Sequence, residues 1–420
     1  MKGLSFLYIL LFILTATASA EEVSGSGAGP LTLADCYALA LKQSEKVAIQ
    51  QELITEAEGK FIRAFGAVLP HVSFASSDKR QDGSGGSAFT LKEVPERKFE
   101  ATQTLFNGFK EIAAMRAARA EKRQRTQDKR RGEQLLFLDV SNAFYLLLEK
   151  QKDQEALEGI RLALVERVQE LKGREQLGRS RGSEVVSAEA RLRRIEADGE
   201  QLRGQATIAG QLLEFLIGRP AGSLREEGIV LTPLGPENEY VTRMEARPDV
   251  GSAQEALQVV ERQLTIARAS FWPTIGLEGT YYTKRAGAAE GVDWDAALTV
   301  DVPIFEGGQS FGAIKEAKAR KDQAKLQLAQ TKRLASLDIQ EVYTQLQSAF
   351  TREAALEKAY LASEENYRLQ VEDYRLNLVS NLDVLDALED LQEDRRDLIH
   401  AQYETKRLYW QLKVAVGETL

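Results

Sequence analysis

The chain has 420 residues, of which 28% are charged and 7% aromatic, and its formal net charge is −8. A negative balance argues against a nucleic acid as the partner, because contacts to phosphate require a basic face. One cysteine, two histidines and three methionines make a transition-metal centre unexpected and an intrachain disulfide impossible. Stability must therefore come from packing or assembly, and we expect no cofactor and no metal.

The N-terminal segment, residues 1–20, has the pattern of a secretory signal peptide. Lys2 precedes an apolar run over residues 4–14, and small residues at 18–20 follow. This run is shorter than the about 20 apolar residues that cross a bilayer. An uncleaved anchor is the alternative, but no basic stop-transfer flank follows. The sequence before Cys36 weakly resembles a lipid-attachment box, yet Cys36 lies too far beyond the apolar run, and we interpret it as an ordinary thiol.

The next segment is predicted to be a helix from Leu33 to about Phe65, because it is rich in Ala, Glu and Lys and contains no proline. Pro70 ends it. Residues 72–78 and 98–106 then alternate between apolar and polar side chains, which predicts two strands of a β-hairpin over residues 71–106. The glycine-rich stretch from 83 to 87 is expected to be the tip of that hairpin.

A long stretch without proline follows, from Phe109 to Leu177. As a helix it would extend about 105 Å at 1.5 Å per residue. A turn and a return helix from Glu184 to Ile217 complete this half of the chain. The return helix and the first helix are each about half as long as the long helix, so two of them stacked end to end would match it. We therefore expect a tall bundle of parallel and antiparallel helices.

The second half of the chain repeats the first. The motif Leu105-Phe106-Asn107-Gly108 recurs 199 positions later as Ile304-Phe305-Glu306-Gly307. The same offset relates a helical seam, the starts of the return helices and the glycines at the helix ends. In the first repeat these residues are Val140, Phe144, Leu147, Glu184, Val185 and Gly218. Their counterparts in the second repeat are, in the same order, Ile339, Tyr343, Leu346, Asp383, Val384 and Gly417. We therefore divide the chain into a first repeat, 21–220, an equatorial linker, 221–240, and a second repeat, 241–420.

The second repeat predicts the same elements. Its hairpin covers residues 274–305, with one strand through Ile275, Leu277 and Tyr281 and a second through Leu298, Val300, Val302 and Ile304. A long helix from Phe311 to Leu376 and a return helix from Asp383 to Val416 follow.

Four strands are too few to close into a barrel, and an open edge invites pairing with another chain. We therefore expect neighbouring subunits to complete the sheet. The alternation favours a wall between lipid and water, although a soluble sandwich shows the same pattern. Aromatic residues near the strand ends are candidates for an interfacial girdle: Trp272, Tyr281, Tyr282 and Trp294.

These features together resemble the TolC-like outer-membrane efflux protein family over nearly the whole mature chain. The resemblance depends on the helix ends at Leu69-Pro70 and Trp272-Pro273, the corners Phe106-Asn107-Gly108 and Phe305-Glu306-Gly307, and the segment 381–387. It implies a mainly α fold with a small β part. In that fold, a long antiparallel α-helical coiled-coil barrel continues from four strands per chain, which contribute to a trimeric 12-stranded transmembrane β-barrel.

The resemblance also implies the function of a channel and not of an enzyme. The expected protein is the outer-membrane exit duct of a tripartite efflux or type I secretion system in a Gram-negative bacterium, with a large periplasmic extension. Its partners are other copies in a homotrimer, outer-membrane lipid, a periplasmic adaptor and an inner-membrane transporter of the RND or ABC type. The alternatives are an adaptor, which should carry one helical hairpin between small β domains, and a coiled-coil spacer, which needs no amphipathic strands.

Two carboxylates are candidates for an acidic ring at the periplasmic entrance. The resemblance implies this role for Asp383 and Asp386, which are spaced i and i+3 and so share one helix face. Three copies around a narrow axis would favour cations. The alternatives are a solvated helix face, continued by Asp390 and Asp397, and a general acid–base pair, for which no nucleophile or metal is evident.

A closing network at the same entrance follows from the resemblance. Tyr374 matches a tyrosine that helps to hold the entrance shut, and Glu184 falls where its acidic partner is expected. Val379 occupies the place of a latch arginine in the best-known member, so the network must differ, and Arg179 or Arg181 are candidates.

The turns between each long helix and its return helix are the expected periplasmic tips. Apolar groups at an exposed tip favour contact with a partner, here the adaptor, while capping of the helix pair against itself is the equal alternative. The tip residues are Leu177, Gly178, Arg179 and Ser180 in the first repeat, and Leu376, Asn377, Leu378, Val379 and Ser380 in the second.

Overall fold

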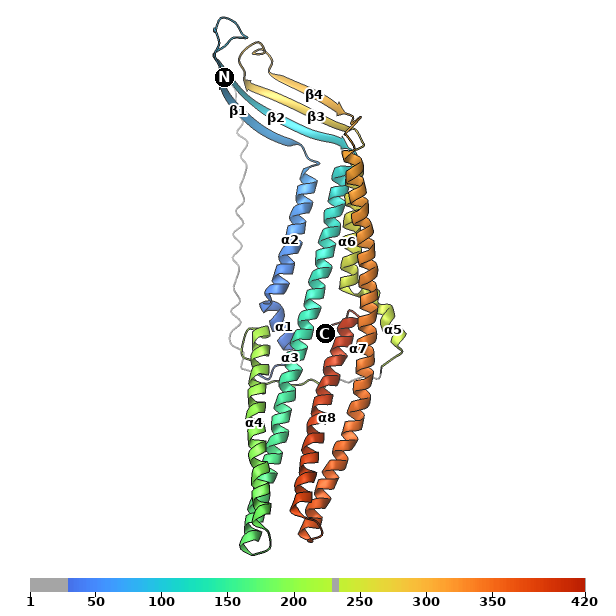
Figure 1. Ribbon diagram of the computed structural model, residues 1–420. Coiled ribbons are helices and arrows are strands. Elements are labelled where there is room, and N and C mark those ends of the chain that lie inside the picture. The colour runs from blue at the N-terminus through green and yellow to red at the C-terminus, as the bar shows by residue number, and fades with distance from the viewer. Residues whose placement is uncertain (1–28, 229–233, 420) are drawn as a thin grey trace.

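A computed structural model describes residues 29–228 and 234–419 (Figure 1). The predicted signal peptide, 1–20, lies outside the described residues. The elements are, in order, α1 Leu33–Gln43, α2 Glu45–Gly66, β1 His71–Arg80, β2 Glu93–Asn107, α3 Lys110–Gln176, α4 Gly182–Ile217, α5 Glu237–Thr242, a 3-10 helix Arg243–Ala246, α6 Pro248–Ala269, β3 Thr274–Lys284, β4 Trp294–Asp301, α7 Gln309–Arg375 and α8 Asn381–Ala415. None of the described helices combines the length and the apolar character needed to cross a bilayer.

The helices form one tall layer below the sheet. The long helices α3 and α7 have 67 residues each, which corresponds to about 100 Å. Shorter helices flank them end to end: α2 and α4 pack beside α3, and α6 and α8 beside α7 (Figure 1). This arrangement confirms the predicted pairing of two half-length helices with each long one. Cross-contacts of α3 with α6 and α8 join the two repeats into a single layer.

Local sequence explains the boundaries of the elements. The single helix predicted from residue 33 is divided at Ser44, which ends α1 and caps α2 by accepting a hydrogen bond from the Val47 N–H at 3.4 Å. The hairpin strands extend a few residues beyond their predicted ends. The prediction for the last strand was wrong, because β4 ends at Asp301 and Val302 and Ile304 lie beyond it. Pro303 has no N–H to donate to the ladder.

Gly218 ends α4 in the left-handed region, with φ 73°. A Cβ atom there would lie 2.8 Å from Gln43 Cδ of α1, so glycine is needed both for the conformation and for the close packing. Gly417, 199 residues later, has φ 91° after the end of α8. Both return helices therefore end beside a left-handed glycine, although Val416 separates Gly417 from the end of α8.

The four strands form one antiparallel sheet in the order β1-β2-β3-β4. The central pair, β2 and β3, comes from the two repeats, so the hairpins merge into one sheet. Phe99 pairs with Phe74 on one side and with Tyr281 on the other. Because side chains alternate between faces, this register gathers apolar side chains on one face: Val72, Phe74, Phe99, Ala101, Ile275, Leu277, Tyr281, Trp294, Ala296, Leu298 and Val300.

The opposite face of the sheet is polar. It carries the ion pairs of Lys98 with Glu96 at 3.0 Å and with Glu100 at 2.7 Å. Tyr282 lies on this polar face and donates its hydroxyl hydrogen to Asp295 at 2.9 Å. Its predicted place in the interfacial girdle was therefore wrong, because neighbouring residues of a strand point to opposite faces. Tyr281 and Trp294 remain exposed on the apolar face, and Trp272 lies exposed where α6 meets β3.

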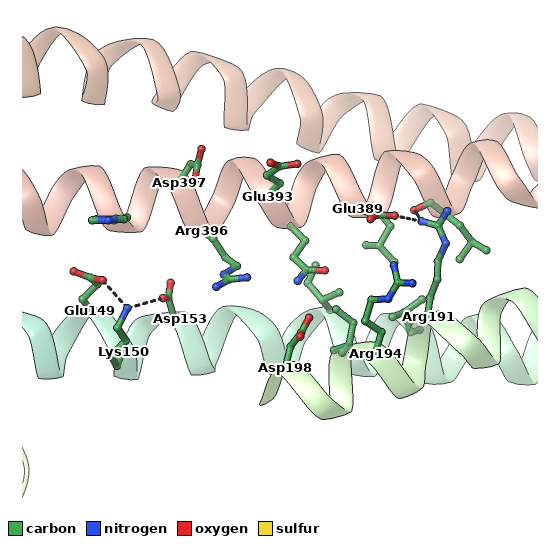
Figure 2. A pocket seen from close by; sticks show the side chains of 17 residues that line it. Glu149, Lys150, Asp153, Arg191, Arg194, Asp198, Glu389, Glu393, Arg396 and Asp397 are labelled. Atoms are coloured by element: carbon green, nitrogen blue, oxygen red, sulfur yellow. Dashed lines mark hydrogen bonds and ion pairs between the residues drawn. The ribbon is translucent and has the colours of Figure 1, made fainter. Parts of the chain in front are cut away.

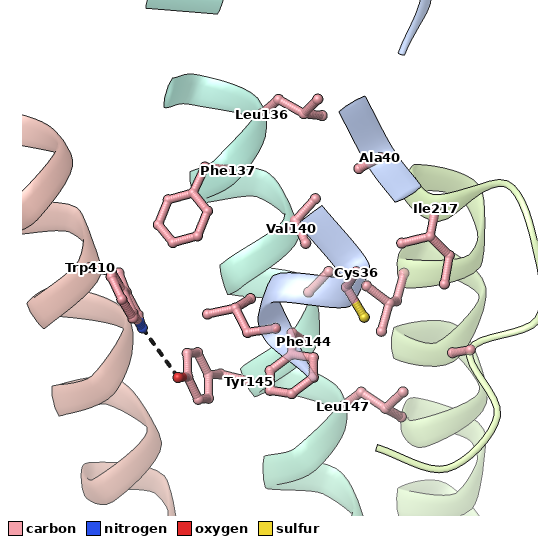
Figure 3. Close-up of a cluster of buried hydrophobic side chains, with 14 of the residues drawn as sticks. Cys36, Ala40, Leu136, Phe137, Val140, Phe144, Tyr145, Leu147, Ile217 and Trp410 are labelled. Carbon is pink, nitrogen blue, oxygen red and sulfur yellow. Dashed lines mark hydrogen bonds between the residues drawn. The ribbon is translucent and has the colours of Figure 1, made fainter. Parts of the chain in front are cut away.

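The main core lies at mid-height, where α1, α3, α4 and α8 meet (Figure 3). Phe137 and Trp410 pack edge to face, and Trp410 Nε1 donates a hydrogen bond to the Tyr145 hydroxyl at 3.2 Å. Cys36 is fully buried in this cluster, and burial raises the pKa of its thiol to about 11. A second apolar cluster, around Leu171 and Leu385, lies further from the sheet and joins helices α3 and α4 to helices α7 and α8.

Candidate functional site

The two helical hairpins end in exposed tips far from the sheet (Figure 1). The turns between α3 and α4 and between α7 and α8 have the same backbone hydrogen bond. At the first, the Arg179 N–H reaches the Arg174 carbonyl at 2.8 Å after Gly178, and at the second the Leu378 N–H reaches the Asp373 carbonyl at 2.9 Å after Asn377. Gly178 and Asn377 are both left-handed, with φ 69° and 60°. The apolar tip side chains stay in solvent: Leu177, Leu376 and Leu378 are 71%, 68% and 69% exposed.

Asp383 has a structural task in addition to any role in a pore. Its carboxylate accepts hydrogen bonds from the Ser380 hydroxyl at 2.6 Å and the Ser380 N–H at 2.7 Å, which completes a capping box at the start of α8. These hydrogen bonds hold the pKa of the Asp383 carboxyl below its ordinary value of 3.8. The side chain is exposed, so its charge reaches the solvent at neutral pH.

Asp386, one turn further along α8, is also exposed but is bound by Arg191 of α4. Arg191 donates from Nη2 to Asp386 Oδ1 at 2.5 Å, and from Nη1 to Glu389 Oε2 at 2.5 Å and to the Leu385 carbonyl at 2.8 Å. This one guanidinium therefore crosses from the first hairpin to the second, where α4 and α8 have little other contact. Sequence reasoning missed Arg191, since about 195 residues separate it from Asp386.

Tyr374 is buried near the tip, where arginines of α3 cover its ring. The guanidinium carbons of Arg167 and Arg174 lie 3.8 Å and 4.5 Å from the ring centroid. Arg167 is itself buried and donates from Nε to Asn381 Oδ1 at 2.8 Å. Arg167 thus connects the α3–α4 hairpin to both helices of the other hairpin.

The other members of the predicted closing network lie apart from Tyr374. Glu184 accepts a hydrogen bond from the Ser180 hydroxyl at 2.5 Å, within its own turn. Among residues 29–228 and 234–419, neither Arg179 nor Arg181 lies within 4.0 Å of a carboxylate. Within one copy the structure therefore brings Tyr374 to Arg167, and the grouping of Tyr374 with Glu184, Arg179 and Arg181 stays a prediction.

Above the tips, a groove of about 410 Å³ lies between the α3–α4 hairpin and α8 (Figure 2). Charges of both signs line it, and Arg191 stands at one end. The described residues include no group of three or more His, Cys, Asp or Glu arranged to hold a metal ion. The charged lining residues are Glu149, Lys150, Asp153, Arg191, Arg194, Asp198, Glu389, Glu393, Arg396 and Asp397.

Two buried carboxylates on the α3 side of this groove differ in how they are compensated. Glu149 accepts from Lys150 at 2.8 Å and from Arg407 at 2.7 Å. Although burial opposes ionisation, these hydrogen bonds lower the pKa of Glu149. The Lys150 ammonium lies 3.9 Å from Asp153 Oδ2, too far for a hydrogen bond, and Asp153 Oδ1 has no hydrogen-bond partner among the described residues. Burial therefore raises the pKa of Asp153.

We expect Asp153→Asn to stabilise the fold at pH 7 by about 1 kcal/mol, because it removes a poorly compensated buried charge. A carboxyl group whose pKa is raised in the folded state contributes its full stability when protonated and loses it as the pH rises through that pKa. The gain should therefore shrink as the pH falls from the raised pKa towards the ordinary value of 3.8, and it should be absent below that value. Melting temperatures at several pH values test this, with Glu149→Gln as a control that should destabilise. A lower melting temperature for both variants at pH 7 would contradict the assignment.

The fold is that of the helical outer-membrane channel proteins. It is similar to a structure of CusC that concerns transmembrane channel formation, with a TM-score of 0.82 at 18% identity, covering 94% of this chain and 96% of that one. A cation efflux system protein CusC of Escherichia coli strain K12 is also among the sequence relatives. The sequence model described as "Outer membrane efflux protein" matches residues 242–418, in the second half.

Other relatives extend this likeness beyond the second half. The alkaline protease secretion protein AprF of Pseudomonas aeruginosa is 23% identical, covering 92% of this chain and 84% of that protein. Nodulation protein T of Rhizobium leguminosarum bv. trifolii is 25% identical over 56% of this chain, and the match spans about half, 52%, of that protein. The chain is therefore similar to outer membrane efflux proteins, through the sequence model in its second half and through these relatives over a larger part of its length.

Proposed function

We infer that this chain is an outer-membrane exit duct, which passively conducts substrates from the periplasm to the outside. The observation that carries this function is the single-layered sheet, continued by a helical layer of about 100 Å. The sheet has one exposed apolar face, one polar face and two edges that no other described strand pairs with. An apolar face in contact with lipid and a polar face toward water form a channel wall. The helical layer extends that wall through the periplasm.

Closure of the wall supports a homotrimer. β1 and β4 are the sheet edges, and in an antiparallel order of four strands they run in opposite directions. β4 of one copy can therefore pair antiparallel with β1 of the next, and three copies make a 12-strand barrel. The outer helices α4 and α7 also expose large apolar side chains that neighbouring copies would cover: Val186, Ile208, Leu212 and Phe215 on α4, and Leu326, Leu334, Leu337, Leu361 and Leu369 on α7.

The helical tips are proposed to form the periplasmic entrance. Exposed Asp383 and Asp386 from three copies supply the acidic ring there. Arg191 acts as a latch, because it holds α8 to α4 through Asp386, Glu389 and the Leu385 carbonyl. Release of this contact would let the α7–α8 hairpin move away from the α3–α4 hairpin.

A periplasmic adaptor and an inner-membrane transporter are the proposed partners. Exposed Leu177, Leu376 and Leu378 at the tips support contact with an adaptor, because apolar groups in solvent are stabilised by a protein partner. Energy for transport is then supplied by the transporter. Both a tripartite efflux system and a type I secretion system fit this arrangement.

We expect the purified full-length mature chain to form trimers in detergent and to conduct ions in planar lipid bilayers. Phe99→Glu with Leu277→Glu places charges on the apolar face of the sheet and should abolish insertion, because charge at mid-bilayer costs a few kcal/mol. Thr102→Glu with Thr280→Glu adds the same charges to the polar face, so insertion should persist. A soluble monomer, or no current even after Arg191→Ala, would overturn the proposed function.

A further inference from the structure

One side of α3 changes from apolar to basic just below the sheet. Ile112, in the first turn of the helix, is 41% exposed. Arg116 and Arg119 follow at i+4 and i+7, so the three side chains form one stripe along the helix. Both arginines are exposed. The stripe begins within a few residues of the end of β2 and continues away from the sheet (Figure 1).

The second repeat carries the same stripe in the same place. Phe311, Lys315 and Lys318 of α7 stand 199 positions after Ile112, Arg116 and Arg119. Phe311 is 72% exposed, and both lysines are exposed. Two repeats that differ at most positions thus share an apolar residue followed by two cations, which points to a common environment for both helices.

None of the described residues supplies a counter-charge to the cations of the stripe. Across residues 29–228 and 234–419, no carboxylate lies within 4.0 Å of Arg116, Arg119, Lys315 or Lys318. Cations slightly further from the sheet are paired: Arg123 with Glu255 at 2.8 Å and Lys321 with Glu261 at 2.9 Å. The four cations of the stripe therefore differ from these cations that follow them along each helix, although cations without a described carboxylate within 4.0 Å, such as Lys325 and Arg333, occur again further along α7.

The stripe on α3 continues across a groove to α6. Arg116, Arg119 and Arg262 line this groove, which has a volume of about 190 Å³. The Arg119 guanidinium lies 4.9 Å from the centroid of the Phe61 ring, so α2 holds it in place. Like charges that gather without internal partners repel one another, and an external anion would relieve the repulsion.

The exposed apolar residues identify the environment. Ile112 and Phe311, together with exposed Trp272 at the junction of α6 and β3, are placed where lipid rather than water would cover them. Arg116 and Arg119 lie about 9 and 14 Å along α3 from its start, at 1.5 Å per residue. Long basic side chains reach back from such positions to headgroup phosphates, while their stems stay on apolar surface.

We propose that Arg116, Arg119, Lys315 and Lys318 bind the phosphate groups of anionic phospholipids in the inner leaflet of the outer membrane. The proposal rests on the proposed function, since it requires the sheet to be inserted. In a trimer these side chains form a belt of twelve cations around the duct. The belt would fix how deeply the protein sits in the membrane.

Quenching of Trp272 fluorescence by brominated lipids tests this directly. Trp272 packs against Phe106 at the sheet end, with ring centroids 6.3 Å apart, so it lies beside the start of α3. The full mature chain with Trp294→Phe would be reconstituted in vesicles of phosphatidylcholine and phosphatidylglycerol, with one or the other brominated. We expect roughly fivefold or greater preference for phosphatidylglycerol at low salt, as cations near an anionic surface give, and a weaker preference at about 1 M salt.

The variant Arg116→Gln, Arg119→Gln, Lys315→Gln and Lys318→Gln should bind both lipids equally. Two controls should keep the preference: Arg116→Lys with Arg119→Lys, which retains the charge, and Arg193→Gln, Arg203→Gln, Arg352→Gln and Lys358→Gln, which removes four cations far from the sheet. No preference in the parent chain, or an unchanged one in the neutralised variant, would overturn the proposal. If neither lipid quenches Trp272, the chain is not inserted, and the proposed function fails as well.

Discussion

Arg191→Ala is expected to open the periplasmic entrance. Arg191 is the principal polar link between α4 and α8, and it meets two carboxylates and a backbone carbonyl. Its partners Asp386 and Glu389 are 56% and 58% exposed, so solvent reduces the link to about 1 kcal/mol per copy. If three copies open together, the closed state loses about 3 kcal/mol, which shifts the equilibrium roughly 100-fold. Single-channel recording in planar bilayers would measure the rise in open probability.

Arg193→Ala is the matched control for the latch. Arg193 lies on the same helix, but it pairs with Glu196 of its own helix at 2.7 Å and is 78% exposed, so its loss should leave the open probability unchanged. Arg191→Lys should give an intermediate result, because an ammonium is a point charge without the planar fork of a guanidinium. Equal open probabilities for Arg191→Ala and the parent chain would remove Arg191 from the gate.

The double substitution Asp383→Ala with Asp386→Ala should abolish most of the cation preference of the channel. In a trimer it removes six carboxylates from the narrowest part of the proposed path, where acidic rings concentrate cations. The expected readout is a reversal potential, under a tenfold salt gradient, that moves towards zero. Block by multivalent cations should weaken in parallel. Because the pKa of Asp383 lies below its ordinary value of 3.8, the preference of the parent channel should persist at mildly acidic pH.

Two further variants separate the ring from other causes. Asp383→Asn with Asp386→Asn removes the charges but keeps a side chain that can cap α8, so it should lose selectivity while the cap remains, and the weaker link to Arg191 should raise the open probability. Asp390→Ala with Asp397→Ala removes two charges further along the same helix and should leave the reversal potential unchanged. If both alanine pairs have the same effect, Asp383 and Asp386 are part of a general acidic face and not of a ring.

The sequence predicted most of the elements because their signals are local. Proline-free runs with a repeated apolar seam predicted α3 and α7, and a period of two predicted the hairpins. Where a prediction failed, a neighbouring residue outweighed the pattern. Pro303 ended β4 before Val302 and Ile304, and the capping hydroxyl of Ser44 divided the first helix.

The candidate site was only partly predictable. Asp383, Asp386 and Tyr374 were found through the resemblance to a family, and the tips through helix ends. Arg167 and Arg191 have no signal of this kind, because their partners come from the other hairpin, about 200 residues away. A cation on a helix surface looks the same in sequence whether it meets solvent or another helix.

By itself, the sequence determined the two repeats, the lengths of the helices and the amphipathic strands, since each depends on the order of nearby residues. Only the tertiary structure decided that β2 pairs with β3 across the repeats, that Arg191 reaches Asp386, and that no described carboxylate lies within 4.0 Å of the four stripe cations. Pairing across distant segments depends on how rigid elements pack in space. A one-dimensional pattern records the elements but not which of their faces meet.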